Sequence, residues 1–215
     1  MGTILFDWDG TIVDSIQALF ETDAAVCRRI GVPFDEAIFR QTFSPDWRLM
    51  YRRLGIPDER VDEAAGVWTA TFHSDRTQPF PGVVEALGRL AAAGHRLGLV
   101  TGGDRAEVEP QLARVGVDHF LTVRVYRDDT PEAKPHPKPL QLALDLAGGP
   151  RSADAAYIGD AFDDVRMAAA LGVRGVGIES MLATADELRA AGAIETAGSV
   201  VEWVDRFLAA TKVPG

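Results

Sequence analysis

Short, β-prone apolar segments alternate with helical patterns along this chain, and that alternation limits its fold more than any other feature. The apolar segments are bounded by turn residues and are too short for helices, so we expect buried strands. These strands are predicted at residues 3–8, 95–101, 119–125, 154–159 and 173–178. Helical patterns, several of them closed by a glycine, lie between the strands at residues 82–94, 104–116, 137–149 and 163–172.

This order predicts an α/β fold in which helices cover both faces of a doubly wound parallel sheet. In such a sheet the ligand site lies beyond the carboxyl ends of the strands. Asp7, Thr101 and Asp160 all fall at such ends. We therefore expect these three residues to share one site.

Residues 15–79 interrupt the alternation. They hold four helix-like patterns without a convincing strand and close at "PFPG", residues 79–82, which is typical of a hinge. We predict that 15–79 is a small α-helical cap domain that folds over the site. The α/β core domain is then discontinuous, formed by 1–14 and 80–215.

Composition excludes several classes of partner. The chain has 215 residues, of which 47% are apolar, and a formal net charge of -10. It can therefore bury a core, but it has no broad basic surface for nucleic acid or an anionic membrane. A signal peptide and a long apolar span are not found, so we expect a cytoplasmic monomer or homodimer. The single cysteine, Cys27, is expected to be a buried apolar residue.

Two carboxylates stand one residue apart in "LFDWDGT", at the end of the first predicted strand. Residues i and i+2 of an extended segment point to the same side, so Asp7 and Asp9 would repel each other unless a cation lay between them. Asp160, Asp163 and Asp164 follow another strand in "YIGDAFDD". Mg²⁺ prefers such oxygen ligands. The alternative is a set of surface turn aspartates.

Two further segments supply the chemistry that a phosphate group needs. "LVTGG" offers the Thr101 hydroxyl and the backbone amides of Gly102 and Gly103, which can approach an anion closely. "EAKPHPKPL" offers Lys134, a point charge suited to a phosphate oxygen. Together with the aspartates, these residues predict a phosphoryl site.

"DWDGT", "VTGG", "KPHPKPL" and "GDAFDD", in this order and spacing, resemble the four motifs of the haloacid dehalogenase superfamily. Within it the chain resembles the phosphoglycolate phosphatase-like group, whose helical cap is inserted between the first and second motifs. The resemblance covers residues 3 to about 180 of the core. The cap matches in position and helical character only.

The resemblance implies a magnesium-dependent phosphatase with an aspartyl-phosphate intermediate. Asp7 would be the nucleophile, and Asp9 would protonate the leaving oxygen and then activate water. Thr101, Gly102, Gly103 and Lys134 would hold the phosphoryl oxygens, and Gly10 and Thr11, which shape the loop beside them, would also contact the substrate. Mg²⁺ would be bound by Asp7, the backbone carbonyl of Asp9 and Asp160, with support from Asp164; Asp163 matches a more variable place.

Several activities occur in this superfamily. Dehalogenases lack the second aspartate, which is present here as Asp9. Phosphonatases use a cap lysine, but the only lysines are Lys134, Lys138 and Lys212. Sugar-phosphate mutases of the beta-phosphoglucomutase type share all four core motifs, but Leu19 stands where they carry a cap histidine. We therefore expect hydrolysis of a small phosphorylated metabolite, with a mutase and a catalytically silent binding module as alternatives.

Cap residues must set the specificity. Arg48 and Arg52 share one helical face and would bind a substrate carboxylate or second phosphate if that face turned toward the site. The alternative is a solvated helix face. His73 and His136 could reach substrate, but a surface or hinge position is the simpler expectation. Three aromatic residues are expected in the cap core: Trp47, Trp68 and Phe72.

Overall fold

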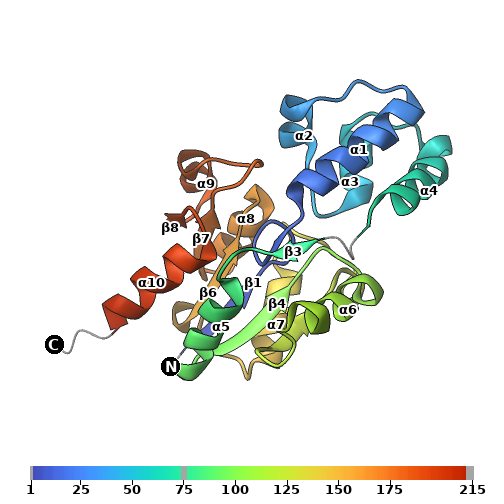
Figure 1. The fold of residues 1–215 in the computed structure, drawn as a ribbon. Coiled ribbons are helices and arrows are strands. Elements are labelled where there is room, and N and C mark those ends of the chain that lie inside the picture. The colour runs from blue at the N-terminus through green and yellow to red at the C-terminus, as the bar shows by residue number, and fades with distance from the viewer. Residues whose placement is uncertain (1, 74–76, 212–215) are drawn as a thin grey trace.

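The computed structural model describes residues 2–73 and 77–211. Its main sheet has six parallel strands in the order β5-β4-β1-β6-β7-β8 (Figure 1). The strands are β1 (Thr3–Phe6), β4 (Arg96–Val100), β5 (Leu121–Val125), β6 (Ala155–Gly159), β7 (Arg174–Ile178) and β8 (Glu195–Ala197). The predicted α/β fold with a parallel sheet is confirmed.

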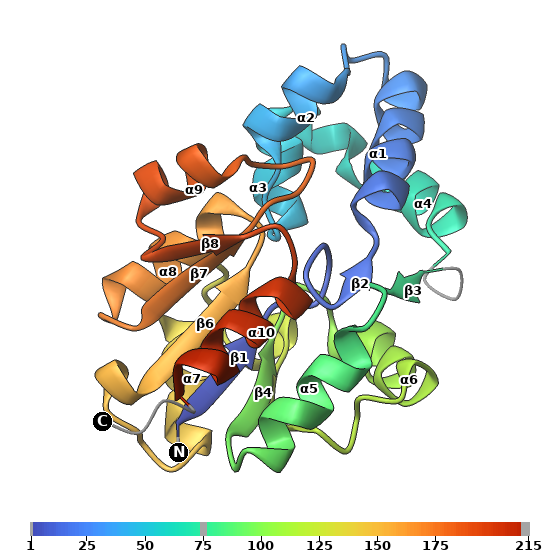
Figure 2. The same ribbon diagram turned by 60° about the vertical axis from the view of Figure 1, so that its left-hand side comes forward.

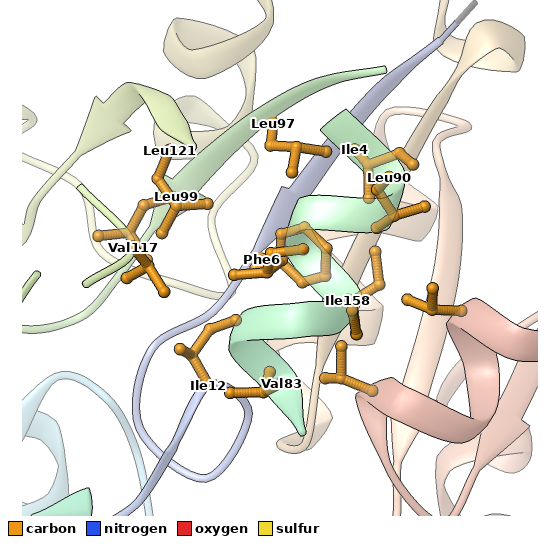
Figure 3. Packing of buried hydrophobic residues seen from close by; sticks show 14 of the residues in the cluster. Ile4, Phe6, Ile12, Val83, Leu90, Leu97, Leu99, Val117, Leu121 and Ile158 are labelled. Carbon is orange, nitrogen blue, oxygen red and sulfur yellow. The ribbon is translucent and has the colours of Figure 1, made fainter. Parts of the chain in front are cut away.

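Helices cover both faces of this sheet because its strands are apolar on both sides. In β1, Ile4 and Phe6 pack into one hydrophobic cluster, whereas Leu5 between them packs into another on the opposite face. The first cluster is covered by α5 (Val83–Ala92), α6 (Arg105–Val115) and α10 (Val200–Thr211). The second is covered by α7 (Lys138–Leu146) and α8 (Phe162–Ala170). Figure 3 shows Ile4 and Phe6 against Leu90 of α5.

The last part of the core was not predicted. It contains α9 (Ala185–Ala191), β8 and α10. β8 has only three residues, too few for a periodic pattern. The start of α9 does carry a signal, since the Thr184 side chain accepts a hydrogen bond from the Glu187 backbone N–H. Among the described residues, none of the helices combines the length and apolar character needed to cross a bilayer.

Four helices lie together beyond the carboxyl ends of the strands (Figures 1 and 2). They are α1 (Ile16–Ile30), α2 (Glu36–Thr42), α3 (Trp47–Arg53) and α4 (Val61–Thr71), with a short 3-10 turn at Asp58–Arg60. Their apolar faces meet in a separate hydrophobic cluster that includes Val26, Phe39 and Tyr51. Cys27 is buried in the same cluster, as expected.

The chain leaves and re-enters the core side by side. β2 (Val13–Asp14) and β3 (Gln78–Pro79) form a two-residue antiparallel pair, and the Phe80 N–H donates to the Ile12 carbonyl at 3.0 Å. β3 lies in the segment for which no strand was expected, because a two-residue strand carries no sequence pattern. We propose the division into a core domain, 1–14 and 80–215, and a cap domain, 15–79.

Candidate active site

The ends of three neighbouring strands bring the predicted core residues together. β1 lies between β4 and β6 in the sheet, so Asp7, Thr101 and Asp160 leave adjacent strands at the same edge. The Asp7 N–H donates to the Ile158 carbonyl of β6 at 2.8 Å, which extends the β1–β6 pairing to this residue. Asp7, Asp160 and Asp164 are all buried and each offers a carboxylate oxygen within 4.8 Å of the others.

Lys134 lies between two of these carboxylates. Its ammonium donates to Asp7 at 2.6 Å and to Asp164 at 2.9 Å, and its side chain is almost wholly buried. Burial alone would lower the pKa of Lys134, but the attraction of Asp164 and Asp7 outweighs burial and holds this pKa above its ordinary value. Lys134 is therefore a charged group fixed beside Asp7.

The buried charges do not balance without a further cation. Three carboxylates share one ammonium, and the Asp160 Oδ2 atom is buried with no hydrogen-bond partner among the described residues. Burial, together with the repulsion between these carboxylates, raises the pKa values of Asp7 and Asp160. The donors are all hard oxygens, and the excess charge is that of one divalent cation. The residues therefore fit Mg²⁺, which implies Asp7 and Asp160 as ligands with Asp164 beside them.

Asp9 stands apart from the three clustered carboxylates. It is partly buried at the rim of the cleft, where the Ser15 hydroxyl donates to its Oδ1 at 2.7 Å. Burial raises the pKa of Asp9, although the Ser15 hydrogen bond and Lys134 pull it down. A carboxyl group with a raised pKa is suited to give and take protons near neutral pH.

Gly10 and Thr11 shape the loop rather than line the cleft. Gly10 has a φ of 72°, and a Cβ atom there would meet the Asp160 carboxylate, so only glycine fits. The Thr11 hydroxyl donates to Asp160 Oδ1 at 3.4 Å. Both residues therefore position Asp160, and their contact with the substrate stays a prediction.

The segment after β4 holds a hydroxyl and an amide ready for an anion. The Gly103 N–H donates to Thr101 Oγ1 at 3.0 Å, so it orients this hydroxyl and leaves its proton for another acceptor. Gly103 itself lines the cleft, and its contact with the substrate stays a prediction. Gly102 lines the cleft, and a Cβ atom there would lie only 2.5 Å from Pro45 Cβ of the cap.

A cleft of about 310 Å³ opens between the core residues and the four helices. Asp7, Asp9, Asp160, Gly102 and Gly103 line its core side. The helical side is mainly apolar, with one buried carboxylate, and its larger side chains are Leu19, Asp23, Phe43, Trp47, Met50, Tyr51, Trp68 and Phe72. The aromatic residues expected in the cap core thus contribute to the cleft surface.

Arg48 and Arg52 are not among the cleft residues. Both are exposed, and the Arg48 guanidinium lies over the Trp47 ring, 4.2 Å from its centroid. Their shared face is thus turned to solvent, because the apolar face of α3, with Met50 and Tyr51, takes the interior position. His73 and His136 are also exposed and line neither of the described pockets.

Sequence reasoning missed several contacts around the site. The Tyr157 hydroxyl lies 3.1 Å from Asp164 and 2.9 Å from the Val100 carbonyl. These contacts hold the Asp164 carboxylate in position. The Ser44 hydroxyl donates to Asp163 at 3.3 Å and so links the helical unit to the core. Asp23, a buried carboxylate in α1, lines the cleft. None of these three carries a local pattern, because the position of each side chain is set by tertiary packing.

Comparison with known proteins identifies the family of this chain. The family model for haloacid dehalogenase-like hydrolases matches residues 4–178. Phosphoglycolate phosphatase from Nitrosococcus oceani is 34% identical over 179 residues, covering 78% of this chain and 79% of that protein. Pyrophosphatase PpaX from Bacillus velezensis is 31% identical over 199 residues, covering 87% of each chain.

Solved structures share the same fold. A hydrolase from Pseudomonas syringae superposes with a TM-score of 0.86 at 21% identity, covering 97% of this chain and 99% of that one. The four sequence motifs, their convergence at one edge of the sheet and these relatives lead to one conclusion. This chain belongs to the haloacid dehalogenase-like hydrolase family and is a phosphatase of its phosphoglycolate phosphatase-like group.

Proposed function

We propose that this phosphatase hydrolyses a small phosphate monoester in two steps and that Mg²⁺ is its cofactor. The observation that carries this proposal is the buried set of Asp7, Asp160 and Asp164 around Lys134, with its excess of negative charge. When bound, Mg²⁺ would offset the charge of the carboxylates and of the incoming phosphate.

In the first step, Asp7 attacks phosphorus to form an aspartyl-phosphate. The bond from phosphorus to the leaving oxygen breaks, and Asp9 gives its proton to that oxygen. In the second step, Asp9 takes a proton from water, the water oxygen attacks phosphorus, and Asp7 leaves as a carboxylate. The raised pKa of Asp9 favours both transfers.

Three groups would hold the transferred phosphoryl oxygens. The Thr101 hydroxyl is oriented by the Gly103 amide, the Gly102 backbone lines the cleft, and Lys134 is held by two carboxylates. Because these groups are fixed before substrate arrives, they cost little reorganisation during the reaction. Leu19 lines the cleft without a proton to exchange, which supports hydrolysis rather than a mutase reaction.

The direct test is hydrolysis of an aryl phosphate such as 4-nitrophenyl phosphate. We expect turnover with Mg²⁺, none with a chelator, and none in Asp7→Asn, which is matched in size but cannot form the acyl phosphate. Asp154→Asn, an exposed substitution far from the cleft, is the control. Turnover that survives Asp7→Asn would refute the role of this nucleophile.

A further inference from the structure

One carboxylate of the cleft has no place in the reaction described above. Asp23 lies on α1, is only 4% exposed and lines the cleft beside the apolar residues of the helical unit. Among the described residues, no side chain or backbone group donates a hydrogen bond to it or forms an ion pair with it, although nearly all buried carboxylates have such a partner. Its carboxylate is therefore open to a partner that enters the cleft.

The rings that line the same cleft as Asp23 indicate the chemistry of that partner. Trp47 and Tyr51 meet edge to face with centroids 5.3 Å apart, and Trp68 stacks on Phe72 at 4.7 Å. All four rings line the cleft. Aromatic faces offer apolar contact and attract cations. A cleft lined by a buried carboxylate and aromatic rings is suited to bind an organic ammonium group.

The charge of the cleft points the same way. Its described lining contains six carboxylates, namely Asp7, Asp9, Asp23, Asp104, Glu107 and Asp160, and no lysine, arginine or histidine. A leaving group that carried a carboxylate or a second phosphate would face these charges without a cationic partner there. A hydroxyl group on the leaving group could donate a hydrogen bond to Asp23. It would, however, leave the negative charge of this carboxylate without a counterion in an apolar environment.

We propose that Asp23 determines specificity, and that the preferred substrate is a phosphate monoester whose leaving group has an apolar body and an ammonium group that pairs with Asp23. This inference rests on the proposed phosphatase function and specifies its substrate class. Burial raises the pKa of Asp23 to about 7, and a bound ammonium group would return the side chain to its charged form.

The test uses phenyl phosphates that differ only at the para position. The four substituents are 2-aminoethyl, propyl, 2-hydroxyethyl and 2-carboxyethyl. We expect kcat/KM for the aminoethyl ester to exceed that for the propyl ester by about 10-fold or more, as for one charge-assisted hydrogen bond. The carboxyethyl ester should be the poorest. A preference for the hydroxyethyl or carboxyethyl ester would overturn the inference.

Asp23→Asn, which keeps size and shape, should make the aminoethyl and propyl esters nearly equivalent while the propyl ester is still hydrolysed. Asp23→Leu should give the same result with a residue that cannot accept a hydrogen bond. Glu21→Gln is the matched control, since it removes one charge from the exposed side of the same helix. An aminoethyl preference that persists in both Asp23 variants would overturn the inference.

A binding experiment separates this inference from the proposed function. The free phenols, 4-(2-aminoethyl)phenol and 4-propylphenol, are titrated against the protein while tryptophan fluorescence is followed, because Trp47 and Trp68 line the cleft. If the amine binds more tightly than the propyl compound, and Asp23→Asn abolishes the difference, the inference is supported even when no ester is hydrolysed. The absence of hydrolysis would contradict only the proposed phosphatase mechanism. Equal binding of the two phenols contradicts the role of Asp23.

Discussion

At the scale of single residues, the core of the site is an electrostatic arrangement in which no charge is stable alone. Lys134 would not remain charged when buried without Asp7 and Asp164, and the attraction of Lys134 in turn favours the charged form of the buried Asp7 carboxylate. The set is incomplete because Asp160 adds a third negative charge. Catalysis and metal binding thus depend on the same imbalance.

Asp23 provides a pH dependence that can be measured without substrate. Its carboxyl has a pKa of about 7 in the folded protein, raised by burial from 3.8. Between these values the unfolded chain loses the proton first, so wild-type stability falls relative to Asp23→Asn as pH rises. We expect the variant to gain up to about 4 kcal/mol in relative free energy of unfolding between pH 4 and pH 8.

Urea unfolding of the two proteins at both pH values measures this gain, because titration of all other groups cancels in the comparison. Glu21→Gln, on the exposed side of α1, should show little change with pH relative to the wild type. A flat difference between wild type and Asp23→Asn would mean that this carboxyl titrates as it does in water.

Sequence alone could predict the core residues but not the cap residues, and the reason is geometric. Asp7, Thr101 and Asp160 follow apolar strand patterns, and a parallel sheet brings such strand ends to one edge. Asp23 lies within an amphipathic helix where an aspartate usually faces solvent, and Arg48 lies within another where either face could have been buried. The rotation of each helix is decided by tertiary packing, which has no local signal.

At the scale of secondary structure elements, two glycines show how differently the same substitution acts. A Cβ atom at Gly102 would meet Pro45 of the loop before α3, so Gly102→Ala should push this loop away and lower kcat/KM for aryl phosphates about 10-fold. Gly66 lies inside α4 with open space around it. Gly66→Ala should therefore stabilise the protein by about 0.5–1 kcal/mol without lowering kcat/KM.

Kinetics and urea unfolding of both variants check this expectation. If Gly102→Ala were as active as the wild type, the contact between the loop and the segment after β4 would not control the site. The length of a secondary structure element decides whether it can be predicted from the sequence. Strands and helices with a clear period were predicted, whereas β8 and the β2–β3 pair, which have too few residues for a period, were not.

At the scale of the whole molecule, contacts between the helical unit and the core hold the cleft in its present shape. Arg40 of α2 forms an ion pair with Glu187 of α9 at 2.7 Å and donates to the Leu182 carbonyl. Ser44 donates to Asp163 of α8. These links bridge residues that are far apart in the chain. The Arg40–Glu187 pair is partly exposed and can open at modest cost, whereas the Ser44–Asp163 bond is buried, and Ala161 and Leu182 of the core pack into the apolar cluster of the four helices.

The Arg40–Glu187 pair should therefore affect substrate binding more than folding. A partly exposed pair contributes about 0.2–1 kcal/mol, so Arg40→Met or Glu187→Gln should each raise KM about 2-fold with little change in the free energy of unfolding. Because the Arg40–Glu187 contact is lost in both cases, the double variant should be no worse than Arg40→Met, which also loses the bond to the Leu182 carbonyl. High salt screens this ion pair, so it should also raise the KM of the wild-type protein.

The pair of Arg89 and Asp205, at 2.6 Å and similarly exposed, is the control because it joins two helices of the core. Arg89→Met and Asp205→Asn should leave KM unchanged, since they do not touch the link to the helical unit. Additive effects of Arg40→Met and Glu187→Gln on KM would contradict a role for their contact. An equal effect of the control pair would mean that KM responds to surface charge in general, rather than to how firmly the four helices are held over the cleft.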